Sequence, residues 1–114
     1  MGYASVSIRV DPSAIGEQLR GRSFVYVLTV RDGGVHAVAH GYDVDGADVI
    51  VETASQSLRD RVALDDRITL LWPPVSESVG EYDDYSLVAD GTGDASNGIL
   101  RVTLASVLLH RPAP

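Results

Sequence analysis

Residues 24–53 read FVYVLTVRDGGVHAVAHGYDVDGADVIVET, and this stretch decides the fold class. Residues 23–31 are dense in β-branched and aromatic side chains, which favour a strand. The Asp32-Gly33-Gly34 sequence then supplies the left-handed conformations of a hairpin turn. Residues 35–42 are therefore expected to pair with the first strand.

The chain continues with a further strand and a change of period. A turn at Asp45-Gly46 leads into a third strand over residues 47–53, so the first three strands are expected to form a meander. Residues 54–64 then return to helical spacing behind a cap at Ser55 or Ser57. This change of period predicts a short helix after the meander.

The residues before and after this region also predict helix and strand. Asp11 offers an N-cap and Pro12 a first helical position, which predicts a helix before the meander. Three more strands are expected over residues 67–72, 85–91 and 99–109. A mainly β fold follows, a small barrel of about six antiparallel strands with short helices, closed so that few strand edges are exposed.

Composition excludes several classes of function. The 114 residues are 45% apolar and 22% charged, which fits one domain over residues 1–114. The chain has no cysteine and no lysine, so thiol, iron–sulfur, Schiff-base and P-loop chemistry are excluded. A net charge of −7 argues against nucleic acid, and no apolar run suits a membrane. A cytoplasmic location is expected.

Four stretches carry a resemblance to a known family. They are residues 24–53, SQSLRDR at 55–61, DDRITLLWPP at 65–74 and YSLVADGTG at 85–93. Through them the chain resembles the pyridoxamine 5′-phosphate oxidase-like, FMN-binding split-barrel family, in particular its small actinobacterial members. The resemblance implies a split β-barrel and a homodimer. It also implies FMN, or a deazaflavin coenzyme, in a groove between subunits, where the coenzyme would carry oxidoreductase chemistry.

The resemblance places the coenzyme phosphate at the start of the second helix. Members of the family follow the third strand with a Ser-x-Lys-x-x-Asn or similar sequence. Here Leu58 stands at the lysine position and Arg61 at the asparagine position. The hydroxyls of Ser55 and Ser57 and the guanidinium groups of Arg59 and Arg61 are the candidate phosphate ligands. Leu58 motivates the alternative, a cofactor-free binding or structural dimer that has lost this phosphate site.

The other coenzyme contacts implied by the resemblance are strand residues. They are Val38, Ala39 and His40 on the second strand, and Val51, Glu52 and Thr53 at the end of the third. Trp72 matches an aromatic residue near the subunit seam, with a core tryptophan as the favoured alternative. A homodimer is also expected from the apolar surface of Trp72, Tyr85 and residues 99–109.

Three other motifs are set aside, and no catalytic side chain is identified. His36 and His40 are about 13 Å apart along a strand, too far to share a metal ion, so they are expected to face solvent or the groove. Residues 43–48 lack the spacing of a calcium loop, and a turn explains them. Gly91-Thr92-Gly93 precedes a strand, so it is not a dinucleotide fingerprint.

Overall fold

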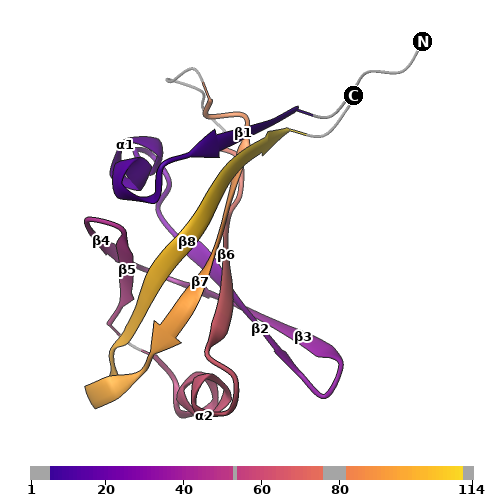
Figure 1. The fold of residues 1–114 in the computed structure, drawn as a ribbon, viewed down its shortest axis with the longest axis vertical. Coiled ribbons are helices and arrows are strands. Elements are labelled where there is room, and N and C mark those ends of the chain that lie inside the picture. Colours follow the sequence, from indigo (N-terminus) through magenta and orange to yellow (C-terminus); the bar gives the residue numbers. More distant parts are fainter. Residues whose placement is uncertain (1–5, 53, 76–81, 112–114) are drawn as a thin grey trace.

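The computed structural model describes residues 6–52, 54–75 and 82–111. They form a mainly β fold with two α-helices and two short 3-10 helices, which confirms the fold class expected from the sequence (Figure 1). In chain order the elements are β1 (Val6–Val10), η1 (Pro12–Ala14), α1 (Ile15–Gln18), β2 (Val25–Arg31), β3 (Gly34–His40), β4 (Asp43–Asp45), β5 (Asp48–Val51), α2 (Gln56–Leu64), β6 (Arg67–Trp72), β7 (Ser86–Asp94), η2 (Ser96–Gly98) and β8 (Leu100–Arg111).

The strands form one antiparallel sheet in the order β3-β2-β6-β7-β8-β5-β4. The long strand β8 has two neighbours on one side, because its first residues pair with β5 and its last residues pair with β1. No ladder joins β3 to β4 or β5 within the described residues. The sheet therefore curls without closing. The split barrel that the resemblance implied is confirmed, and the expectation of a closed barrel with few exposed edges is wrong.

The third predicted strand has different partners from those expected. The hairpin of β2 and β3 forms as predicted, with Asp32 and Gly33 in left-handed conformations at its turn. However, β5 pairs with β4 and β8 instead of continuing a meander from β3. Val49 and Val51 become fully buried in this position. Strand β3 is mostly exposed, with His36 and His40 half-buried.

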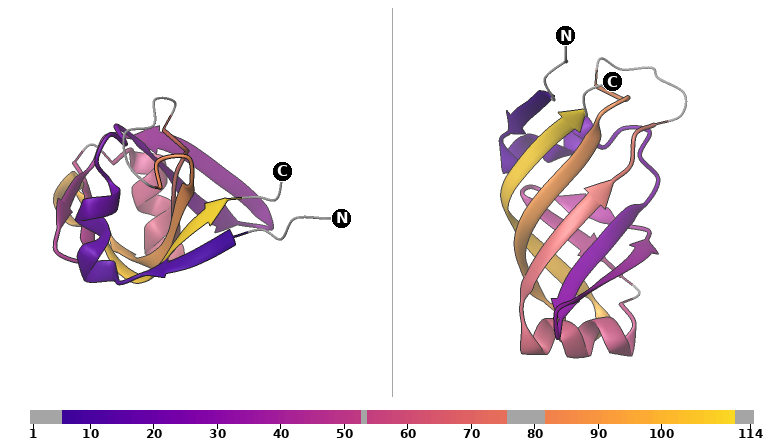
Figure 2. Two further views of the ribbon diagram at one scale, coloured as in Figure 1. Left: turned by 90° about the horizontal axis from the view of Figure 1, so that it is seen from above. Right: turned by 90° about the vertical axis from the view of Figure 1, so that its right-hand side faces the viewer.

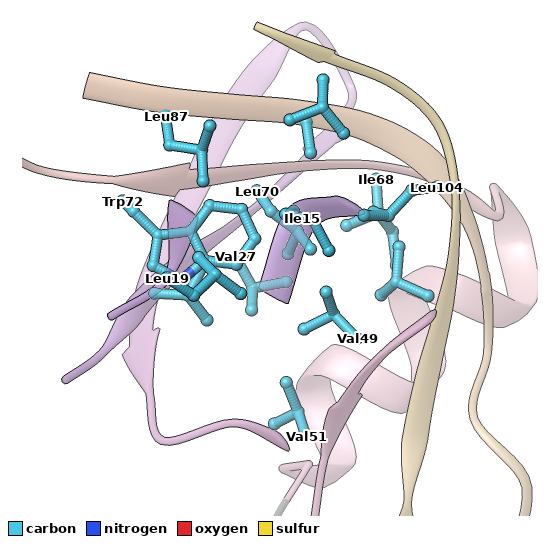
Figure 3. Close-up of a cluster of buried hydrophobic side chains, with 14 of the residues drawn as sticks. Ile15, Leu19, Val27, Val49, Val51, Ile68, Leu70, Trp72, Leu87 and Leu104 are labelled. Carbon is cyan, nitrogen blue, oxygen red and sulfur yellow. The ribbon is translucent and has the colours of Figure 1, made fainter. Parts of the chain in front are cut away.

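The core fills the inside of the curled sheet. Its largest fully buried side chains are Trp72, Ile15, Leu70, Leu87, Leu100 and Leu109. Figure 3 shows side chains from helix and strands converging on this interior. Helix α2 lies across one end of the barrel, where Leu58 and Val62 are buried, and α1 lies toward the other end (Figures 1 and 2). Within the described residues, no helix is long and apolar enough to cross a bilayer.

Two features of the fold were not expected from the sequence. The strand β1 pairs with the last residues of β8 and packs partly buried Val6, Ile8 and Val10 against the core. In addition, Arg22 is a buried charged residue, 6% exposed. Strand β1 and the Arg22 side chain both add contacts at the end of the barrel where α1 lies.

Candidate functional site

Strand β3 borders the split and is exposed over most of its length. Its side chains alternate between two sides, as the pairing with β2 shows. His36, Val38 and His40 lie on the side of the barrel interior, opposite buried residues of β2. Ala39 lies on the outer side, so Val38 and Ala39 cannot contact one face of the same ligand. A strand of this composition, with no charged side chain to protect its edge, is suited to being covered by another molecule.

A cationic pocket lies between the β2–β3 hairpin and α2. Its volume is about 370 Å³, and Arg31, His36 and Arg61 line it together with Asp32, Gly34 and Val35. Arg61 is half-buried, and its Nε is buried without a hydrogen-bond partner. The one carboxylate in the pocket, Asp32, lies 3.8 Å from Nε of Arg31 and is almost fully exposed. Two guanidinium groups therefore face one screened carboxylate, and the pocket is suited to an anion.

The two arginines expected to share a phosphate are separated. Arg59 lines another pocket, of about 330 Å³, together with Gly93, Asp94 and Ser96. Two positions along a helix differ by about 200° in direction, so Arg59 and Arg61 lie on opposite sides of α2. Of the pair, only Arg61 reaches the cationic pocket beside β3.

The serines and Leu58 at the start of α2 have distinct roles. Ser55 is the N-cap, and its Oγ accepts a hydrogen bond of 3.1 Å from the backbone N–H of Leu58. Ser57 is exposed and lies four positions before Arg61, on the same side of the helix. Leu58 is 3% exposed and belongs to the core. A lysine at that position would place its charge in the barrel interior, so packing explains the leucine.

The predicted contacts at the ends of β3 and β5 are divided between core and surface. Val51 is fully buried, so only its backbone is available to a ligand. Glu52 is exposed and lines a pocket of about 230 Å³ with Gly41, Tyr42 and Asp43. Thr53 lies outside the described residues.

His40 is half-buried, its Nε2 is buried without a hydrogen-bond partner, and burial lowers its pKa. His40 therefore offers a neutral imidazole beside the split.

Trp72 belongs to the core. It is fully buried and meets Tyr42 edge to face, with ring centroids 5.7 Å apart. The core alternative is therefore correct, and we do not retain Trp72 as a ligand contact. Tyr85 is also buried, so neither residue supplies the exposed apolar surface from which a dimer was expected.

Other side chains form an apolar outer face. The strand registers align Ala39, Tyr26, Leu71, Val88 and Leu108 in one row across five strands. Beside this row lies a groove of about 610 Å³, and the groove is lined in part by Val30 and Val35, which are 57% and 67% exposed. We refer to this row and the groove as the outer face. A row of apolar side chains on the outward side of a sheet is typical of a surface that another molecule covers.

The remaining motifs have structural explanations. No three His, Cys, Asp or Glu side chains cluster to hold a metal ion in the part of the chain that the structure describes. Gly46 turns between β4 and β5, and Arg101 bonds Asp48 and Asp45 beside that turn, at 2.7 and 3.4 Å. These pairs fix the hairpin to β8.

No protein-family model matches the chain. Over 99 residues it is 34% identical to uncharacterised proteins of Mycobacterium bovis and Mycobacterium tuberculosis. The match covers 78% of this chain and 66% of each relative, so the chain spans about two thirds of the length of these curated relatives.

Solved structures resemble the chain over most of its length. An FAD-binding protein from Mesorhizobium loti has a TM-score of 0.68 at 10% identity, covering 93% of this chain and 99% of its own. An oxidase-like protein from Listeria innocua, described as a putative pyridoxamine 5′-phosphate oxidase, has a TM-score of 0.60 at 11% identity, covering 86% and 96%. An F420 reductase has a TM-score of 0.59 at 15% identity, covering 80% and 94%. At these low sequence identities, the structural similarity shows that the chain and these proteins share a fold.

Proposed function

The chain has the split-barrel fold of pyridoxamine 5′-phosphate oxidase-like proteins, and from it we propose a flavin-type coenzyme-binding, oxidoreductase-like function. The observation that carries the proposal is the cationic pocket of Arg31, His36 and Arg61 at one end of the exposed strand β3. A fold alone does not define a function, whereas a pocket for an anion beside an apolar strand fits a ligand with a phosphate and a ring system. The structures of similar fold, described as FAD-binding and as an F420 reductase, support the same class of coenzyme.

Different residues would bind the phosphate and the ring system of this coenzyme. Arg61, with Arg31, His36 and the hydroxyl of Ser57, would hold the phosphate by charge-assisted hydrogen bonds. Val38 and the neutral His40, on the same side of β3, would lie along the ring system. Nε of Arg61 and Nε2 of His40 are buried without a hydrogen-bond partner and are therefore open to a ligand, as is Nε of Arg59 in its separate pocket. A bound flavin would supply hydride or electron transfer. FMN is the favoured coenzyme, with a deazaflavin as the alternative.

The proposal includes a homodimer formed through the outer face. The row from Ala39 to Leu108 and the groove beside it would be covered by a second copy of the chain. Because β3 contributes Ala39 to this face and Val38 to the split, the coenzyme groove would lie next to the subunit boundary.

Titration with FMN tests the coenzyme assignment. Wild-type protein is expected to bind FMN saturably, and Arg61→Ala is expected to weaken binding about tenfold or more, because a guanidinium bond to phosphate contributes about 1.5–3 kcal/mol. Arg59→Ala is the matched control, since Arg59 lies on the opposite side of α2, and it should bind as the wild type does. Equal affinity in wild type and Arg61→Ala contradicts the phosphate site.

A second candidate function has its own support. Leu58 is a core residue at the position where the family's lysine is expected, which favours a cofactor-free binding or structural dimer. Colourless protein that shows no saturable titration with FMN or a deazaflavin would select this alternative.

A further inference from the structure

The groove of the outer face has an apolar end and a charged end. The strand registers align Leu28 of β2, Thr69 of β6 and Asp90 of β7 in one row across the groove. Val30 and Val35 pair with each other in the next row, on β2 and β3. All five residues line the groove, whose volume of about 610 Å³ is in the range of small-molecule sites. The apolar end therefore lies on β2 and β3, and the charged end lies on β6 and β7.

One carboxylate at the charged end has no counter-charge. Arg67 donates from Nε and Nη2 to the two carboxylate oxygens of Asp65, at 3.0 and 2.7 Å, so these two charges compensate each other. Hydrogen bonds from the side chain and backbone of Arg67 lower the pKa of Asp65 to about 2. Asp90 differs, because no ion pair to it is found in the part of the chain that the structure describes. The groove therefore carries one uncompensated negative charge.

The Asp90 carboxylate lies at an irregularity of β7. The register of β7 with β8 shifts between Asp90 and Gly91, and Gly91 also lines the groove. Such bulges redirect side chains and are common beside functional sites. The hydroxyl of Thr69 donates a hydrogen bond of 2.6 Å to Oδ1 of Asp90, whereas Oδ2 accepts none from the described residues. Oδ2 is therefore open to a donor from a ligand.

We infer that the groove binds a small organic cation, a protonated amine that carries an apolar body. The ammonium group would donate to Asp90. The apolar body would lie over Leu28, Val30 and Val35. Leu28 and Asp90 are two strand spacings apart, ~10 Å, so the amine and the far end of the apolar body should be separated by a similar distance. A single positive charge matches the single uncompensated carboxylate, and an anion would be repelled.

This site goes beyond the proposed coenzyme site and is complete within one chain. Val35 borders both the groove and the cationic pocket, but the two share no charged residue. The site therefore requires neither a flavin nor a second copy. It is also compatible with the proposed homodimer, because a second copy over the outer face would otherwise bury the Asp90 carboxylate without a counter-charge, which is costly.

Calorimetric titration of the wild-type protein with 4-phenylbutylamine, in the absence of flavin, tests the site. This probe is protonated at neutral pH and carries an apolar ring. We expect saturable binding of the amine. The uncharged 4-phenylbutanol and the anionic 4-phenylbutyrate should bind about tenfold more weakly or worse, because a hydrogen bond to an ionised group is worth about tenfold or more in affinity. A wild type that does not bind the amine, or that binds the alcohol equally well, would overturn the site.

Variants locate the binding in the groove. Asp90→Asn removes the charge but keeps an oxygen that can accept from the Thr69 hydroxyl, and it should bind the amine about tenfold more weakly. Val30→Ser should weaken the amine and the alcohol alike, because both lose apolar contact. Asp43→Asn is the matched control, with the same charge change at an exposed position on β4, and should bind as the wild type does.

The remaining outcomes are also decisive. Wild-type affinity in Asp90→Asn, or an equal loss in Asp43→Asn, would overturn the assignment to Asp90. Circular dichroism checks folding. If Asp90→Asn unfolds, amide chemical shifts of the wild type replace it, and an amine that leaves the shifts of Leu28 and Asp90 unchanged would overturn the site. A protein that binds the amine but not FMN would contradict the proposed coenzyme and support this site.

Discussion

Gly91 and Gly93 show how a sequence motif can serve packing. Strand β7 has a register shift between Asp90 and Gly91. A Cβ on Gly91 would collide with the backbone carbonyl of Thr103, whereas a Cβ on Gly93 would meet the ends of the Ile68 and Leu100 side chains. Side-chain ends can rotate, but the paired backbone of β8 cannot move freely.

We therefore expect Gly91→Ala to be the more damaging of the two substitutions. Its cost should be at least the roughly 1–3 kcal/mol typical of overpacking, and Gly93→Ala should cost less. Urea unfolding of both variants measures the difference. A Gly93→Ala variant that is less stable than Gly91→Ala would contradict this explanation.

Arg22 fastens three segments at the α1 end of the barrel. Its guanidinium donates to the backbone carbonyls of Gln18, Pro73 and Tyr82, at 3.0, 2.9 and 3.1 Å. Its own carbonyl accepts a hydrogen bond from the hydroxyl of Tyr42. Burial lowers the pKa of Arg22, and the nearby Asp83 carboxylate counters this effect.

Removing this side chain should cost far more than removing an exposed arginine. We expect Arg22→Ala to lower the free energy of unfolding by about 3 kcal/mol or more, because three carbonyl groups lose their donor. Arg20→Ala is the neighbouring control and should change stability by less than about 0.5 kcal/mol. Thermal or urea unfolding measures both, and equal stability of the two variants would rule out the fastening role.

At the scale of elements, α2 depends on its N-cap. The sequence left Ser55 and Ser57 as alternatives, and the structure assigns the cap to Ser55. We expect Ser55→Ala to destabilise the protein by about 1 kcal/mol, and Ser57→Ala to change stability little. If Ser57 helps to hold a phosphate, Ser57→Ala should weaken FMN binding instead. Unfolding and titration on the same two variants separate these roles, and a stability loss in Ser57→Ala would contradict the assignment.

The sequence predicted elements better than it predicted their partners. Local composition was sufficient for β2, β3 and β6, because β-branched residues and Gly turns act within a few positions. It could not predict that β5 would pair with β8, since that choice depends on which surface buries Val49 and Val51. The cationic pocket was partly predicted through Arg61. Arg31 was missed because only the tertiary fold brings the hairpin next to α2.

At the scale of the whole molecule, the two sides of the barrel wall have different proposed roles. The inner side forms the core, and at β3 it carries His36 and His40 beside the split. The outer side supplies the apolar row that a second copy would cover. These roles meet only at β3, so coenzyme binding and dimer formation can be separated by mutation.

Arg61→Ala should weaken FMN binding without breaking the dimer, whereas Leu71→Glu should break the dimer. Leu71 lies at the middle of the apolar row, and a carboxylate there should break the dimer because it would be buried without a partner. If the coenzyme groove is completed by the second copy, Leu71→Glu should also lose FMN binding. Arg61→Ala should lose FMN affinity and remain dimeric, since Arg61 lies on α2 in the cationic pocket. Light scattering combined with FMN titration distinguishes the outcomes, and a monomeric Leu71→Glu that binds FMN as tightly as the wild type would show that one chain forms the whole site.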